Sequence, residues 1–425
     1  MMSVCRAPSL YIFSALLLTV TSLRAQTFSV YGGDMPPLLA LKDTRNNLSV
    51  FLVYGTQNLS VQFSGAEPAL HQWFRFPQGS AADAVPVHST QSGITSTLPN
   101  PLPGFGYCVG LPTLPSAHFV YIIDYEPLLP SVTDFTFDPT SDPCDRLTFS
   151  AQASIPKIFY YIPSSHIPYE LKRAFTLSYE TLQWSQEDKA FLPTDVHETI
   201  ADPSSFSIPS PLCDTRFRLT GDSFSLHFGQ PIDLLSPSFI ASSVQAHADT
   251  LLLSPSLSAP ASIRFSAYAN DPVAFLYSWT IYPNNEPDKP IIRFTGKELE
   301  YTFTRSGLYT ATLQVANRDG SCADETQLFS FEIPESFIDI PNAFSPTASP
   351  GVNDVFRIAH KSLLNFRASV FNRWGKLLFS WSNPDDGWDG RIHGALAPPG
   401  TYFYVIQYTD AQGRPRKHTG PVHLF

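Results

Sequence analysis

The chain has 425 residues, enough for about two to four domains, and 43% of its residues are hydrophobic, so each part can bury a core. Charged residues make up only 15%, below the usual share of about 25%. The 39 prolines, together with 33 Phe and 18 Tyr, favour short strands joined by turns and argue against long helices.

The first 25 residues are typical of a secretory signal peptide. Arg6 provides a positive start, residues 10–20 form a short apolar segment, and Ala25 precedes the expected cleavage point. The apolar segment is shorter than the roughly 20 residues that span a bilayer, and no later segment is apolar enough. We therefore expect no transmembrane segment after signal removal. Cys5 lies ahead of the apolar segment, which argues against a lipoprotein.

The charge of the chain is unevenly distributed. Residues 336–425 contain nine basic and six acidic side chains, a net charge of +3, whereas residues 26–335 carry a net charge of −15. An acidic body argues against nucleic acid and anionic membranes as partners. The simplest reading of this charge is solubility outside the cell.

Residues 26–127 and 128–238 each show the short alternating strands of an immunoglobulin-like sandwich of about 100 residues. In the first stretch, residues 47–54 and 118–125 alternate most clearly, and Trp73 is a candidate core residue. In the second, residues 213–221 and 223–228 are expected to form a closing hairpin.

Four cysteines remain after signal removal: Cys108, Cys144, Cys213 and Cys322. An exported protein reaches a compartment where disulfides persist, and four cysteines allow three pairings. We favour a Cys144–Cys213 bridge, because it would tie an early strand to a late strand of one module. Closing a loop of that length contributes about 4 kcal/mol.

The stretch 239–335 has a strand tryptophan, Trp279, and a glycine and tyrosine, Gly307 and Tyr309, at the start of its next long strand. This pattern resembles a polycystic kidney disease (PKD) domain, which implies an immunoglobulin-like sandwich. The Gly-Asp-Gly that usually follows the tryptophan strand is absent. A purely structural role is the alternative: the glycine permits a turn and the tyrosine closes the end of the sandwich.

Residues 336–425 contain several separated motifs in a fixed order and two expected hairpins, with turns at 372–375 and 410–413. The motif residues are Pro341, Asn342, Phe344, Ser345, Pro346, Asn353, Asp354, Phe356, Asn372, Arg373, Trp374, Gly375, Gly387, Trp388, Asp389, Gly390, Gly400 and Tyr402. They resemble the gliding-motility-associated C-terminal domain, the type B sorting domain of the type IX secretion system. One departure is Thr347-Ala-Ser-Pro in place of the more usual Asn-Gly-Asp before Gly351.

The resemblance implies that this segment directs export across the outer membrane and that the type IX secretion machinery is a partner. It also implies an extracellular or outer-surface location in a Gram-negative bacterium. We expect the folded segment to be recognised as a surface that includes six basic residues: Arg373, Lys376, Arg391, Arg414, Arg416 and Lys417.

Candidate chemistry is sparse. Asp385, Asp386 and Asp389 suggest a calcium loop, but turn geometry explains them better and their spacing lacks the EF-hand order. Glu180, Glu187 and Asp188 suggest a glycosidase pair only weakly. No nucleophile elbow, phosphate loop or histidine pair at metal spacing occurs. We predict no catalytic residues, no metal, no cofactor and no enzymatic activity.

The sequence thus predicts an all-β chain of tandem immunoglobulin-like sandwiches with a small all-β C-terminal sorting domain. The predicted domains are a signal peptide (1–25), two sandwiches (26–127 and 128–238), a PKD-like domain (239–335) and the sorting domain (336–425). For the body we expect adhesion or structural display, with other cell-surface proteins as partners. The alternative is binding or processing of surface polysaccharide, for which Trp73 and Trp184 are candidate stacking rings.

Overall fold

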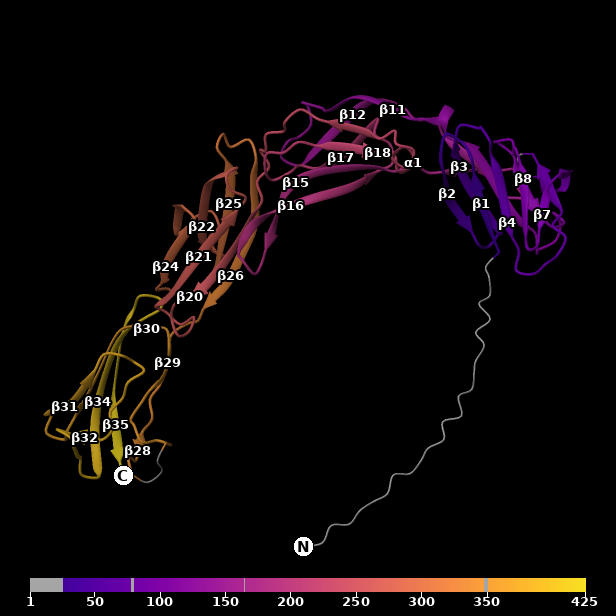
Figure 1. Cartoon of the computed structure of the whole chain (residues 1–425). Helices are drawn as coiled ribbons and strands as arrows, with labels where there is room; N and C mark the ends of the chain where they lie inside the picture. Colours follow the sequence, from indigo (N-terminus) through magenta and orange to yellow (C-terminus); the bar gives the residue numbers. More distant parts are fainter. Residues whose placement is uncertain (1–25, 78–79, 164, 348–350) are drawn as a thin grey trace, which may run out of the picture.

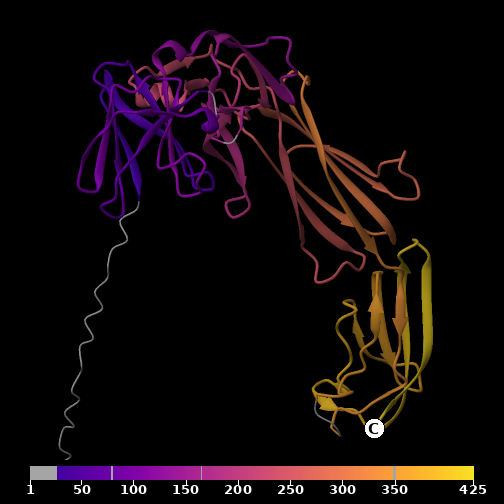
Figure 2. The same cartoon turned by 90° about the vertical axis from the view of Figure 1, so that its right-hand side faces the viewer.

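The computed structural model describes residues 26–77, 80–163, 165–347 and 351–425, so the predicted signal peptide lies outside the described residues. Figures 1 and 2 show four groups of strands that follow one another along a curved path in chain order. We call them the first module (β1–β10), second module (β11–β19), third module (β20–β26) and fourth module (β27–β35). The expected all-β fold class is confirmed. Among the described residues, no helix is long and apolar enough to cross a membrane.

The first module is a sandwich of two sheets whose strands pair as β1-β4-β8-β7 and β2-β3-β10-β9-β5-β6. The strands are β1 (Thr27–Tyr31), β2 (Met35–Asp43), β3 (Leu48–Tyr54), β4 (Ser60–Ser64), β5 (Trp73–Phe76), β6 (Val85–Val87), β7 (Thr90–Ser92), β8 (Thr95–Pro99), β9 (Gly106–Val109) and β10 (His118–Asp124), with short 3-10 turns at Ala81–Asp83 and Glu126–Leu128. Trp73 is fully buried between the sheets, and its indole N–H donates to Ser96 Oγ at 2.9 Å. Its ring is therefore a core residue, because burial leaves no face free for a ligand.

The second module also has two main sheets, with orders β11-β12-β17 and β16-β15-β18-β19, and a separate hairpin β13-β14. The strands are β11 (Ser131–Phe137), β12 (Arg146–Ser154), β13 (Ile158–Tyr161), β14 (Pro168–Leu171), β15 (Phe175–Ser185), β16 (Ala190–Ile200), β17 (Ser205–Pro209), β18 (Arg218–Gly221) and β19 (Ile232–Leu235). Phe149, Phe175 and Phe217 are fully buried in its core.

The expected closing hairpin at 213–228 is wrong in its second half, where residues Ser223–His227 form a short helix, α1. The carboxylate of Asp222 accepts a hydrogen bond from the backbone N–H of Ser225, which is a helix N-cap. Phe224 and Phe228 are buried while Leu226 is 65% exposed. Burial therefore repeats every four residues, a helical period, although the alternating letters suggested a strand.

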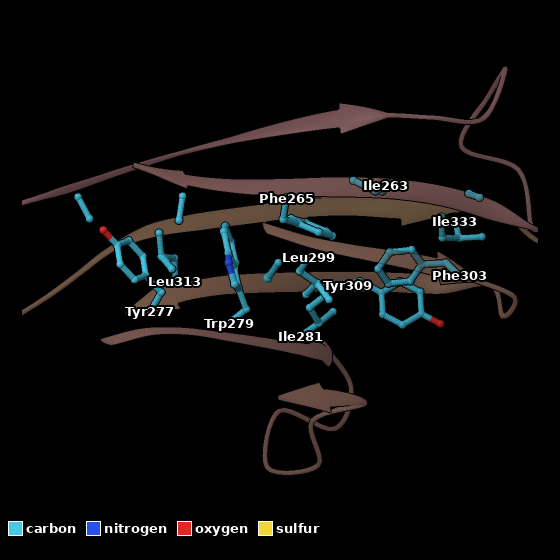
Figure 3. Close-up of a cluster of buried hydrophobic side chains, with 14 of the residues drawn as sticks. Ile263, Phe265, Tyr277, Trp279, Ile281, Leu299, Phe303, Tyr309, Leu313 and Ile333 are labelled. Atoms are coloured by element: carbon cyan, nitrogen blue, oxygen red, sulfur yellow. The ribbon is translucent and has the colours of Figure 1, made fainter. Parts of the chain in front are cut away.

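The third module packs the sheet β20-β21-β24 against the sheet β23-β22-β25-β26. The strands are β20 (Ala246–Leu252), β21 (Ala261–Ala269), β22 (Ala274–Pro283), β23 (Ile292–Thr295), β24 (Glu298–Phe303), β25 (Gly307–Asn317) and β26 (Ala323–Ile333). Figure 3 shows Trp279 in the middle of the core between Phe265 and Leu313, with Tyr309 beside Phe303.

Gly307 and Tyr309 occupy the structural roles that the sequence suggested. Gly307 has a φ of +147°, a backbone conformation that side chains with a Cβ rarely adopt. The hydroxyl of Tyr309 donates to the carbonyl of Arg305 at 3.0 Å, so the ring closes the end of the sandwich near a polar edge.

The fourth module is built on one sheet with the order β28-β35-β34-β30-β31, accompanied by the pairs β27-β29 and β32-β33. The strands are β27 (Phe337–Asp339), β28 (Ala343–Phe344), β29 (Ala359–Lys361), β30 (Leu363–Phe371), β31 (Leu377–Trp381), β32 (Arg391–Ile392), β33 (Ala395–Leu396), β34 (Gly400–Asp410) and β35 (Pro415–Leu424). Both expected hairpins are present, because β30 pairs with β31 and β34 pairs with β35 in antiparallel register.

The first and second modules share one hydrophobic cluster. Phe224 of α1 and Phe228, which directly follows it, pack with Tyr125 and with the outer face of β3 and β10, the face that points away from the other sheet of the first module; the β13-β14 hairpin joins the same cluster. The predicted boundary at 127/128 crosses this cluster. Burying apolar surface across the junction couples the two modules mechanically.

A buried ion pair lies beside the same cluster. Arg173 donates to Asp222 Oδ2 at 2.7 Å, and the Tyr125 hydroxyl donates to Asp222 Oδ1 at 2.7 Å. Both charged side chains are nearly inaccessible to solvent. Burial by itself raises the pKa of Asp222, but hydrogen bonds from Ser225, Tyr125 and Arg173 outweigh it and hold the pKa below its ordinary value.

The second and third modules are joined by a disulfide between Cys144 and Cys322, so the expected Cys144–Cys213 bridge is wrong. Cys144 lies in the loop before β12, opposite the turn that joins β25 to β26. Cys213 is a free cysteine whose thiol donates to the Glu180 carbonyl at 3.7 Å. Cys108 is also free, and burial raises the pKa of its thiol to about 12. The prediction failed because it considered pairs within one module, whereas the ends of neighbouring modules meet here.

Polar and aromatic contacts reinforce this second junction. The buried amide of Asn270 donates to the carbonyls of Leu212 and Ser243, each at 2.9 Å. Trp184, on the long β15-β16 hairpin, stacks on His247 of β20 with ring centroids 4.4 Å apart. The disulfide and these contacts hold the hairpin of the second module along the third.

The third and fourth modules are joined through the β34-β35 turn. Ala411 of this turn is buried in the core of the third module, and its carbonyl accepts from the Ser306 N–H at 3.1 Å. The Ala411 N–H donates to Ser336 Oγ at 2.7 Å, and Ser336 Oγ donates to the Ser362 carbonyl. Ser362 Oγ in turn accepts from the Ala259 N–H at 3.1 Å. The linker at 334–336 is therefore fixed on both sides.

Replacing Asp222 by Asn should lower the free energy of unfolding of the first two modules by roughly 3–5 kcal/mol, because Arg173 would keep a buried charge without its partner. Since the pKa of Asp222 is lower in the folded state, wild-type stability should fall as the pH drops below about 4, and this component should be absent in the variant. Urea unfolding between pH 3 and 7 measures both effects. Asp233→Asn, which removes an exposed pair with Arg218, is the matched control and should have little effect. Equal losses in the two variants would contradict the assigned importance of the buried pair.

Peptide mapping of the protein under non-reducing conditions should recover a cross-linked peptide that contains Cys144 and Cys322. Cys213 should be alkylated without reduction, because its thiol is free and partly exposed. Cys213→Ser should leave the cross-link intact, whereas Cys322→Ser should abolish it and lower stability by roughly 2–5 kcal/mol. Recovery of a Cys144–Cys213 peptide would overturn the pairing.

Candidate functional site in the C-terminal module

The fourth module contains most of the motif residues that the sequence singled out. Four of the aromatic ones form its core: Phe344, Phe356, Trp388 and Tyr402 are all buried. Trp388 lies at the centre, with ring centroids 5.4 Å from Phe344 and 5.1 Å from Tyr402. Its indole N–H donates to the Arg391 carbonyl at 2.9 Å. These residues hold the loops against the sheet and do not face solvent.

Other motif residues build turns. The side-chain carbonyl of Asn372 accepts from the N–H groups of Trp374 and Lys376 at 3.0 and 2.9 Å, and Gly375 has a φ of +80°. Asp389 Oδ1 accepts from the Arg391 N–H at 3.0 Å. The motif therefore encodes a hairpin turn and a crossover loop.

Close approaches explain the glycines of the crossover loop and the residues near it. A Cβ on Gly387 would lie 2.6 Å from the Phe356 carbonyl oxygen, and one on Gly390 would lie 2.7 Å from the Pro346 ring. Gly400 has a φ of +153°, and Asn353 has a φ of +56°.

The remaining motif residues near 341–354 connect the loop to the last strand by hydrogen bonds. The Asn342 carbonyl, which follows Pro341, accepts from the His423 N–H at 2.9 Å. Ser345 Oγ donates to the Phe425 carbonyl at 3.0 Å, and Asp354 accepts from the Gly351 N–H.

Arg373 and Trp374 of the motif project from the module at the β30-β31 hairpin. Trp374 is 75% exposed at the tip of the β30-β31 hairpin. The guanidinium carbon of Arg373 lies 4.2 Å from the centre of the Trp374 ring, a cation–π contact. A partner protein can therefore reach these two side chains directly.

The expected patch of six basic residues is divided by the structure. Arg414 and Arg416 both donate to Asp410 Oδ2 at 2.9 Å. Burial raises the pKa of Asp410, but hydrogen bonds from the Arg414 backbone and both guanidinium groups outweigh it and lower the pKa to about 2. Arg391 lies 3.7 Å from Asp389. Among the described residues, Arg373, Lys376 and Lys417 form no ion pair.

The acidic residues suggested as a calcium loop do not converge. Asp385 contacts His360 at 3.2 Å, Asp389 caps its own turn, and the Asp386 N–H donates to the Asn383 carbonyl at 3.0 Å. No group of three His, Cys, Asp or Glu side chains within the described ranges is arranged to hold a metal ion.

The acidic residues suggested as a glycosidase pair also belong to different parts of the β15-β16 hairpin. Glu180 lies opposite Asp195 in the β15-β16 ladder, whereas Asp188, next to Glu187, accepts from Ser185 Oγ at 2.7 Å in the hairpin turn. Sequence reasoning did not single out Arg173 and Asp222, although they form the most deeply buried ion pair in the part of the chain that the structure describes. Only the spatial meeting of residues 49 positions apart identifies them.

Replacing Trp388 by Ala should lower the stability of the fourth module by roughly 3–5 kcal/mol, because a large cavity would open between the rings of Phe344 and Tyr402. Trp374→Ala removes the same side chain from an exposed turn and should change stability by less than about 0.5 kcal/mol. Differential scanning calorimetry of the full chain measures both. Similar shifts for the two tryptophans would contradict the division of the motif into core and surface.

Comparison with known families identifies three stretches. Residues 136–236 match the fibronectin type III domain model, and residues 250–328 match the PKD domain model. Residues 338–424 match the CHU_C type IX secretion signal domain. A search of curated proteins found no match. The C-terminal match implies export by the type IX secretion system and a secreted or cell-surface protein.

Three solved structures that resemble the chain do so with low TM-scores. The tetra-tandem repeat in the extending region of a large adhesion protein is 9% identical, with a TM-score of 0.20 and coverage of 94% of this chain and 100% of that one. A Ca²⁺-stabilized adhesin that helps an Antarctic bacterium bind ice is 11% identical, with a TM-score of 0.20 and coverage of 95% and 99%. Latent PorU from Porphyromonas gingivalis is 13% identical, with a TM-score of 0.15 and coverage of 72% and 35%. We base no inference on these resemblances.

Proposed function

We propose that the fourth module is the export signal and that the first three modules form a non-enzymatic body displayed outside the cell. The chain carries a PKD domain followed by a type IX secretion signal domain. The observation that carries this proposal is the match of residues 338–424 to the secretion signal domain. The proposal also includes the domain boundaries predicted from the sequence. It places the protein finally on the outer surface of a Gram-negative bacterium.

The junctions support a structural role for the body. A shared core, a disulfide with buried polar contacts, and an inserted turn connect the four modules in succession. Such junctions make a chain of sandwiches stiff, because bending would expose buried apolar and polar groups. A stiff body can hold its first module away from its last and serve in adhesion or as a structural element.

The polysaccharide alternative receives no comparable support. Trp73 is buried, and one face of Trp184 is covered by His247, so neither ring is a free stacking platform. The acidic residues Glu180 and Asp188 take part in strand and turn structure. We therefore place adhesion or structural display ahead of polysaccharide binding and processing.

Deleting residues 336–425 should leave the protein in the periplasm, because the export signal would be lost, whereas deleting residues 26–127 should leave export intact. Protease accessibility of the body in intact cells, combined with periplasmic fractions, measures the distribution. The second deletion uncovers part of a shared core, so its yield has to be normalised to total protein. Surface exposure of the chain without residues 336–425 would refute the proposal.

A further inference from the structure

The sheet of the fourth module has one covered face and one open face. Along β34, Tyr402 and Ile406 point into the core, whereas Phe403, Val405 and Gln407 point outward, as strand alternation requires. Strands β30 and β35 alternate in the same way.

An apolar row crosses four strands of the open face. The register places Phe371 of β30 opposite both Leu377 of β31 and Phe403 of β34, and Phe403 opposite Pro421 of β35. Leu377 is 53% exposed, Phe403 is 44% exposed, Pro421 is exposed and Phe371 is half-buried. At the usual strand spacing the row is about 14 Å long. We call these four residues the apolar row.

A cationic row runs parallel to it. Four residues away from the apolar row on β30, β34 and β35, in the same direction across the sheet, lie Arg367, Gln407 and Lys417. They lie opposite one another and are all exposed. The separation between the rows is about 13 Å at the usual rise of a strand. Within the described part of the chain, neither Arg367 nor Lys417 has an ion-pair partner, unlike Arg414 and Arg416. Sequence analysis missed Arg367, although its place in the alternating segment 366–371 marks it as outward-facing.

The apolar row lies away from the body of the chain. The contact with the third module is made by the turn after Asp410, and Phe403 is seven residues from it, about 23 Å along β34. The hydrogen bond from Ser336 in the linker to the Ser362 carbonyl fixes the fourth module relative to the linker. The body of the chain therefore cannot fold back over the open face of this sheet. The face is thus presented at the end of the chain farthest from the first module, as Figure 1 shows for β31 and β34.

We propose that this open face is the surface that docks onto the export machinery, on a partner protein with an apolar stripe and acidic side chains about 13 Å from it. The inference rests on the proposed export function and identifies the surface that carries it. Charge complementarity requires an acidic partner for Arg367 and Lys417. A single row of four apolar residues is small beside the 20–30 residues per side of a stable interface, so it suits a transient contact and not a permanent dimer.

The test uses the full-length chain in its native bacterium. Phe403→Thr and the double variant Arg367→Glu/Lys417→Glu should each lower the ratio of surface to periplasmic protein at least tenfold. Threonine is well accepted in exposed strand positions, so an unchanged melting temperature should confirm that the module is folded. Leu308→Thr, at a similarly exposed apolar strand position in the third module, is the matched control and should be exported normally. The double variant Arg367→Lys/Lys417→Arg keeps both positive charges and should be exported like the wild type.

Normal export of folded Phe403→Thr and of the double charge reversal would overturn the docking surface. If the chain without residues 336–425 is retained in the periplasm in the same experiment, the export function stands and only the docking surface fails. A variant that is exported normally but changes from dimer to monomer in analytical ultracentrifugation would assign the face to a second copy of this chain and would also overturn the proposal.

Discussion

The modules of this protein bury side chains against their neighbours, so each depends on the next segment of the chain for part of its packing. Modules of about 100 residues have limited cores, and the ends of a two-layer sandwich are the places where that core is open to water. Phe228 of the second module covers the outer face of the β3-β10 sheet of the first module, and Ala411 of the fourth module enters the core of the third. This sharing of cores determines the stiffness of the chain and the direction in which its last module points.

The electrostatics follow the same arrangement. At the first junction, Arg173 and Asp222 are buried together and satisfied by Tyr125 and Ser225. At the last, Asp410 holds Arg414 and Arg416 beside the turn that inserts into the third module. Two of the positive side chains of the fourth module, Arg414 and Arg416, are thus paired with Asp410 at the junction. Of the cations outside these ion pairs, Arg367 and Lys417 lie on the sheet face, and Arg373 and Lys376 lie at the β30-β31 hairpin.

The motif of the fourth module encodes its fold more than its recognition. Trp388, Tyr402 and Phe356 are buried, and Asn372 with Gly375 shapes a turn. The proposed docking surface consists of different residues, those that alternate with the core residues along β30, β34 and β35. Substitutions in the motif therefore act first on stability, and their effect on export has to be separated from unfolding.

The sequence by itself determined the all-β class, the hairpins at 372–375 and 410–413, and the sorting domain, because these depend on local alternation, turn residues and short motifs. It did not determine the α1 helix, where the capping carboxylate of Asp222 and the burial of Phe224 and Phe228 override an alternating pattern. Nor did it determine the partner of Cys144, the Arg173–Asp222 pair or the row from Leu377 to Pro421. Those features join residues that are distant in sequence, and only the packing of one module on the next and the register between strands bring them together.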